Sequence, residues 1–68
     1  MVDMTLDEAR DRVIRYLDGI LAVNEHTQVK VGNTFYNLND LKSQVSMMTG
    51  DGQTYILKIA NSRDWNIT

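Results

Sequence analysis

The chain contains one histidine and no cysteine, which limits the catalytic and metal-binding chemistry available to it. A Ser–His–acid triad needs a histidine that an acid orients and that contacts a nucleophile. His26 lies in a polar connection beside Glu25, so we expect an exposed loop residue rather than a general base. Protein metal sites need several His, Cys or carboxylate ligands at defined spacings, and the sequence shows no such cluster. We therefore predict a protein that is not an enzyme and that binds no metal and no cofactor.

The glycine-containing segment 49–52, Thr-Gly-Asp-Gly, has the composition of a phosphate-binding loop. Such a loop also carries a lysine and connects a strand to a following helix. This segment lacks the lysine, and we expect it to follow a helix and precede a strand. The series of acidic ligands of a calcium loop is also missing. The segment is therefore predicted to be a turn.

Acidic side chains alternate with arginines in the N-terminal part of the chain, where Glu8–Arg12 and Asp11–Arg15 are spaced as ion pairs on a helix. This alternation is typical of a solvated helix face rather than of paired catalytic carboxylates. Nucleic-acid binding needs a basic surface, whereas the formal net charge here is −2. Nucleic acid is therefore not an expected partner.

These charges lie on a predicted amphipathic helix over residues 5–23, which organises the rest of the chain. Its apolar residues occupy one arc of roughly 180° at about 100° per residue. These residues are Leu6, Ala9, Val13, Ile14, Tyr16, Leu17, Ile20, Leu21 and Val23. The arc is wider than a coiled-coil seam, so the helix should lie on a sheet or in a broad groove. Thr5 and Glu8 form a capping box, and Asn24 is expected as a left-handed C-terminal cap. Arg10 falls inside the arc, either covering the core edge with its stem or facing a partner.

A β-hairpin is predicted over residues 27–38, because apolar and polar residues alternate on both sides of a Gly-Asn turn. In this register Val29 faces Tyr36 and Lys30 faces Phe35. The first pair should point at the N-terminal helix, which leaves Phe35 on the opposite face.

A second helix is predicted to begin after Asn37 or Asn39, either of which can cap it. Its apolar positions are Leu38, Leu41, Val45 and Met48. Residues 53–60 alternate with the period of a strand, which places Leu57 toward the core and Ile56 outward. This third strand returns either parallel to the second strand or antiparallel beside the first. The order helix, strand, strand, helix, strand predicts an α+β domain. Its mostly antiparallel three-stranded sheet is packed by the N-terminal helix.

The whole chain, residues 1–68, is expected to form this one domain, with residues 61–68 as a docking C-terminal tail. Several large side chains have no place in the predicted core: Phe35, Met47, Ile56, Trp65 and Ile67. Either Trp65 packs over Phe35 and Ile56 on the outer sheet face, or these residues form a partner or dimer surface. Together with Arg10 they are the candidate partner-binding residues. The partner is expected to be a larger protein or a second copy of the chain.

The chain contains no apolar run long enough to span a membrane and no signal peptide. The absence of cysteine suits the cytoplasm. A cytoplasmic protein with no membrane partner is therefore expected.

Residues 5–48 resemble the gpW-like head-to-tail joining proteins of tailed phages in element order, in length and in the Asp-Leu-Lys start of the second helix at residues 40–42. Members of that family pack two helices on a β-hairpin, complete the phage head and provide a seat for the tail. This chain departs from them at the strand predicted for residues 53–60 and at its non-basic C-terminus, so no functional residue is transferred. We expect a non-enzymatic protein-interaction module, phage-encoded on this resemblance, that acts as an inhibitor or adaptor in the host cytoplasm. The alternative is a virion structural protein of the head-joining type.

Overall fold

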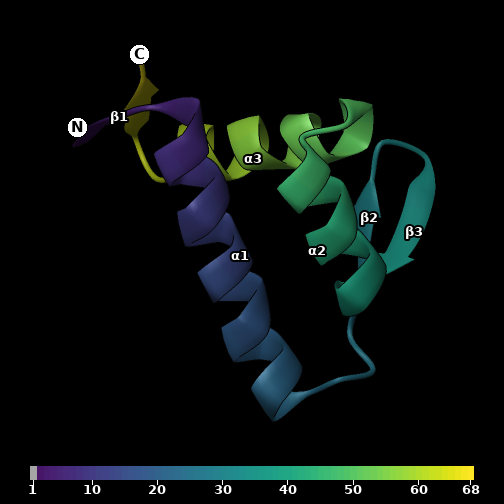
Figure 1. Cartoon of the computed structure of the whole chain (residues 1–68). Helices are drawn as coiled ribbons and strands as arrows, with labels where there is room; N and C mark the ends of the chain where they lie inside the picture. The colour runs from purple at the N-terminus through teal and green to yellow at the C-terminus, as the bar shows by residue number, and fades with distance from the viewer. Residues whose placement is uncertain (1) are drawn as a thin grey trace.

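The computed structural model describes residues 2–68 as an arrangement of helices with two small sheets. The elements in chain order are β1 (Val2–Met4), α1 (Leu6–Val23), β2 (Gln28–Val31), β3 (Thr34–Asn37), α2 (Leu38–Met47), α3 (Gly50–Ser62) and β4 (Trp65–Ile67). The α+β class is confirmed. The predicted three-stranded sheet is wrong, because the described strands form two separate pairs, β1–β4 and β2–β3. These pairs lie at opposite ends of the molecule with the helices between them (Figure 1).

α1 confirms the predicted N-terminal helix and begins with the predicted cap. The Thr5 hydroxyl accepts a hydrogen bond of 3.2 Å from the backbone N–H of Glu8. At the other end Asn24 has φ −149° and ψ 91°, so the predicted left-handed cap is wrong and the helix ends in extended backbone.

The buried face of α1 is narrower than the predicted arc. Its fully buried residues lie on one stripe and are Ala9, Val13 and Leu17. Tyr16 and Val23, which were expected in the core, are 41% and 89% exposed. The difference arises because α1 packs against α2 and α3 rather than across a sheet. A helix neighbour covers a narrower strip than a sheet does, so part of the apolar arc stays in contact with solvent.

The hairpin has the predicted register, with Val29 opposite Tyr36 and Lys30 opposite Phe35. Gly32 adopts φ +62° in its turn, a conformation that glycine reaches without steric cost. Val31 is buried in the core, whereas Phe35 points away from it. The hairpin packs on α2 and α3, so the expectation that it faces α1 is wrong.

α2 begins at the first of the two predicted caps. The Asn37 side chain accepts a hydrogen bond of 2.8 Å from the backbone N–H of Asp40. The fully buried residues of α2 follow the predicted spacing and are Leu38, Leu41 and Val45. Met48 ends the helix with φ +51° and packs partly buried against the core.

α3 replaces the turn and the strand predicted for residues 49–60. Thr49 is its N-cap and the two glycines that suggested a turn lie in its first residues. The buried residues of α3 follow helical spacing and are Gly52, Tyr55, Ile56 and Ala60. Ile56 is fully buried and Leu57 is 44% exposed, the reverse of the strand prediction. Gly52 explains why a glycine-rich segment is helical here, because α3 passes close to the backbone of α2 at this residue.

The chain ends form the second sheet, in which β1 and β4 pair in parallel with Val2 opposite Trp65. Residues 2–4 therefore form a strand, which places β1 beside β4 from the other end of the chain (Figure 1). Asn66 Nδ2 donates a hydrogen bond of 2.8 Å to Asp3 Oδ1 on the outer face. Trp65 and Ile67 pack partly buried against the core. Trp65 does not cover Phe35, because β4 and the hairpin lie at opposite ends.

Candidate protein-binding surface

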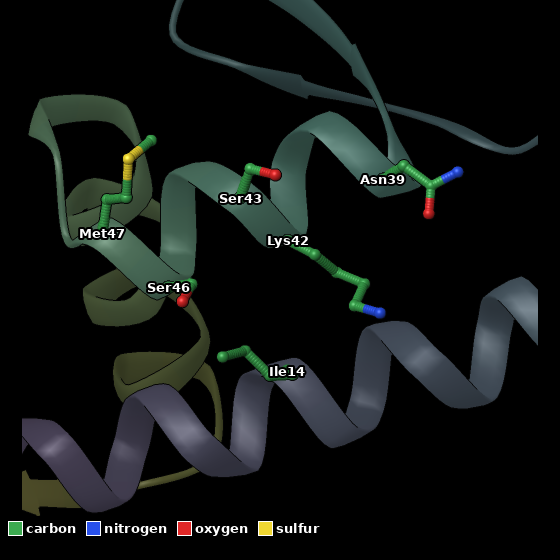
Figure 2. Close-up of a pocket in the computed structure, with 6 residues that line it drawn as sticks. All are labelled: Ile14, Asn39, Lys42, Ser43, Ser46 and Met47. Atoms are coloured by element: carbon green, nitrogen blue, oxygen red, sulfur yellow. The ribbon is translucent and has the colours of Figure 1, made fainter.

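A surface hollow of about 570 Å³ lies between α1 and α2. It is lined by Ile14, Asn39, Lys42, Ser43, Ser46 and Met47 (Figure 2). The Lys42 side chain extends from α2 toward α1, and its Nζ atom forms an ion pair with Asp18 of α1. Neither serine is activated there by a histidine, since His26 lies exposed in the connection after α1, 3.6 Å from Glu25. The hollow therefore contains no nucleophile paired with a base.

A second hollow of about 460 Å³ lies on the C-terminal half of α1. It is lined by Arg15, Tyr16, Gly19, Ile20, Val23 and Asn24 and is mostly apolar. α1 extends beyond α3 in this region, so no other helix lies over its outer side (Figure 1). The apolar arc of α1 continues to Val23, and the uncovered part of that arc forms this hollow.

Arginines and aromatic rings continue from this hollow toward α3 and β4. The Arg63 Cζ atom lies 5.1 Å from the centre of the Tyr16 ring. One helical turn earlier on α1, the Arg12 Cζ atom lies 5.8 Å from the centre of the Trp65 ring. Both distances are within the range of cation–π contacts. We call the combined set the α1 surface: Arg12, Arg15, Tyr16, Gly19, Ile20, Val23, Asn24, Arg63 and Trp65.

The positive charges of the α1 surface have no carboxylate partners within residues 2–68. No ion pair involves Arg12, Arg15 or Arg63 in that range, so the predicted Glu8–Arg12 and Asp11–Arg15 pairs are wrong. The acids of the opposite flank of α1 are instead neutralised locally. Arg10 lies 3.5 Å from Asp7 and 3.3 Å from Asp11, and Lys42 pairs with Asp18.

The residues predicted to bind a partner are not gathered into one surface. Phe35 is 66% exposed on the hairpin, where Lys30 Nζ lies 5.7 Å from the centre of its ring. Met47 is 63% exposed at the end of α2. Arg10 is partly exposed beside its two acids, and Trp65 and Ile67 lie on β4.

Ile56 was predicted on an exposed outer face, and that placement is wrong because it is fully buried between the helices. Sequence reasoning also missed Tyr16 and Val23 as surface residues, since both fit the core arc. The width of that arc was the signal that could have identified them. A helix packed by other helices buries a narrower stripe, so the rest of a wide apolar arc stays exposed.

A part-buried side-chain hydrogen bond connects the hairpin to α3. The Tyr36 hydroxyl donates a hydrogen bond to the Asp51 carboxylate in the first turn of α3. That bond, followed by burial and by the charge of Asp51, raises the pKa of Tyr36 above its ordinary value of 10.0. Burial likewise raises the pKa of Tyr55.

This contact predicts a pH dependence of stability. A phenol whose pKa is raised in the folded state contributes stability that is complete below the unfolded pKa of about 10 and is lost as the pH rises through the folded pKa. Tyr36→Phe removes the Tyr36 contribution and leaves that of Tyr55. We expect the thermal midpoint to fall less between about pH 9 and about pH 11 in this variant than in the wild type. Equal falls of the thermal midpoint in the wild type and in Tyr36→Phe, measured by circular dichroism, would contradict the contribution of the Tyr36–Asp51 hydrogen bond.

Comparison with protein-family models, curated proteins and solved structures gave no match. Across residues 2–68, no group of three or more His, Cys, Asp or Glu side chains is placed to hold a metal ion. In that same span no helix is long and apolar enough to cross a membrane. The geometry and charge of the α1 surface are therefore the features that indicate a function.

Proposed function

We propose that this chain is a non-enzymatic protein-binding module that uses the α1 surface to cover part of a larger protein, as an inhibitor or an adaptor in the cytoplasm. The observation that carries the proposal is the uncovered apolar hollow of about 460 Å³ on α1. Val23 and Tyr16 are large apolar side chains on its wall that remain exposed to solvent. Contiguous exposed apolar surface is typical of interaction sites.

The composition of the α1 surface favours a protein rather than a small molecule. Small-molecule sites are concave and bury most of the ligand, whereas this hollow is shallow and lies on the outside of one helix. Tyrosine, tryptophan and arginine are enriched among residues that dominate binding energy in protein interfaces. All three types occur here, at Tyr16, Trp65 and the three arginines.

A matched pair of substitutions tests this proposal. Val23→Gln places a polar side chain in the hollow, and Phe35→Gln makes a similar change on the distant hairpin. Burying a valine side chain contributes about 1.5 kcal/mol, which corresponds to roughly tenfold in affinity. We expect Val23→Gln to weaken capture of the partner from a lysate of the source cells about tenfold, and Phe35→Gln to leave it unchanged.

Both residues are exposed, so both variants should fold, which circular dichroism checks directly. Loss of capture with Phe35→Gln alone would move the binding site to the hairpin and contradict the proposal. Equal capture by the wild type and both variants would also contradict it.

A second candidate function is that of a virion structural protein of the head-joining type. It is supported by the order of α1, the β2–β3 hairpin and α2, on which the resemblance to gpW-like proteins rests. It requires the chain to be present in purified virus particles rather than free in the host cytoplasm. Quantitative mass spectrometry of the particle and cytoplasmic fractions distinguishes the two functions.

A further inference from the structure

We propose that the partner segment bound by the α1 surface is an acidic amphipathic helix. This inference rests on the proposed function and specifies the chemistry of the partner at the same surface. It depends on three observations: the lack of ion pairs at three arginines, the contacts of two guanidinium groups with aromatic rings, and the shape of the apolar hollow.

The arginines around the hollow form no ion pair with the described residues, although the chain as a whole is acidic. Arg12, Arg15 and Arg63 border the α1 surface, and none forms an ion pair with a carboxylate of residues 2–68. The formal net charge is nevertheless −2. These three guanidinium groups are therefore open to carboxylates from outside the chain, and an acidic partner supplies them.

Two of these arginines contact aromatic rings of the same surface. Arg12 lies over the Trp65 ring and Arg63 lies over the Tyr16 ring. A guanidinium group that contacts a ring face keeps an N–H edge that can donate two parallel hydrogen bonds to a carboxylate. This geometry favours glutamate or aspartate over other polar groups.

The apolar part of the surface matches a helix in length and spacing. Tyr16, Ile20 and Val23 follow one another at helical spacing along α1. The span from Arg12 to Asn24 measures about 18 Å at the α-helical rise, which corresponds to about three turns of a partner helix. Gly19 lies between the apolar residues, and no atom lies within 4 Å of the position a Cβ would take there. A partner backbone can therefore approach α1 closely at the middle of the hollow.

Two other occupants are disfavoured. A second copy of the chain that docked symmetrically would bring its own arginines against Arg12, Arg15 and Arg63. A nucleic-acid backbone binds through its phosphates and has no apolar face to fill the hollow.

The test is a selection from a yeast-displayed library of 16-residue peptides in which each position carries Ala, Leu, Gln, Glu or Lys. The full chain is the bait. A protein of negative net charge attracts Lys-rich peptides in general. If the arginines of the α1 surface determine binding, the selection should instead enrich Glu over Lys. Leu should recur at helical spacing in the same peptides. For a selected peptide, Arg12→Glu and Arg63→Glu should each weaken binding about tenfold, whereas Lys30→Glu, the same charge change on the hairpin, should have little effect.

Enrichment of Lys, or no charge bias, would overturn the inference. An equal loss with Lys30→Glu would also overturn it, because the effect would then come from net charge alone. If neutral peptides are selected and Val23→Gln abolishes their binding, the proposed function holds but the acidic partner is wrong. Binding that is insensitive to both Val23→Gln and the arginine variants would contradict both proposals. Tighter binding of a fluorescein-labelled oligothymidylate than of the selected peptides at low salt would reassign the surface to nucleic acid.

Discussion

Replacing Gly52 with alanine is expected to lower the free energy of unfolding by about 3 kcal/mol. A Cβ atom at this position would lie 2.0 Å from the backbone O of Gln44 and 2.8 Å from the backbone N of Val45. Both contacts are with the backbone of α2, which cannot move aside as the end of a flexible side chain can. Because α3 and α2 must separate, the packing of Ile56 and Val45 is lost as well.

The size of this effect follows from the small stability of a short chain. A domain of 68 residues has roughly 3–10 kcal/mol of stability, so a loss of about 3 kcal/mol is a large part of the total. Urea unfolding followed by circular dichroism measures the change.

Gly19 supplies the matched control, because it lies inside α1 with no atom within 4 Å of an added Cβ. Gly19→Ala should therefore raise stability by about 1 kcal/mol, since alanine favours a helix over glycine. If Gly52→Ala were as stable as Gly19→Ala, the close crossing of α2 and α3 would be contradicted.

Truncation of Ile56 to alanine is expected to cost about 3 kcal/mol, while the same truncation of the adjacent Leu57 should cost less than about 1 kcal/mol. Ile56 has no exposed surface and packs in the core, so its removal leaves a cavity between the helices. Leu57 is exposed on the outer side of α3 and leaves no enclosed cavity.

This pair distinguishes the helix from the strand suggested by the alternation of residues 53–60. A strand places Leu57 in the core and Ile56 outside, so the two effects would be exchanged. A larger loss with Leu57→Ala than with Ile56→Ala in urea unfolding would contradict the assignment of α3.

The elements with strong local signals were predicted correctly. Side-chain caps at Thr5 and Asn37 mark the starts of α1 and α2, and the Gly-Asn turn fixes the hairpin register. Each of these signals involves residues close together in the chain. The surrounding structure does not have to be known to read them.

The elements that depend on distant contacts were not predicted. The glycines at the start of α3 indicate a turn until the close approach of α2 to Gly52 is known. The sequence of residues 53–60 fits a strand and a helix equally well, because neighbouring apolar residues satisfy both periods. β1 and β4 are three residues each and pair across the whole chain, so their pairing is visible only in the fold.

The candidate surface was predicted only in part. Trp65 was identified from its terminal position, and the structure places its ring beside Arg12 rather than over the hairpin. Tyr16 and Val23 were assigned to the core, because a sheet was expected to cover the whole apolar arc of α1. The described strands do not form that sheet, so both residues lie on the surface, where they line the hollow.

The most direct test of the central claim, that the α1 surface binds a protein, is to map the contact on the chain itself. The ¹⁵N-labelled chain is titrated with the captured partner and amide shifts are followed by NMR. We predict that the shifts concentrate on residues 12–24 and 63–65, with residues 28–37 of the hairpin unchanged. Shifts confined to the hairpin, or to the separate hollow between α1 and α2 around Lys42 and Met47, would contradict the account.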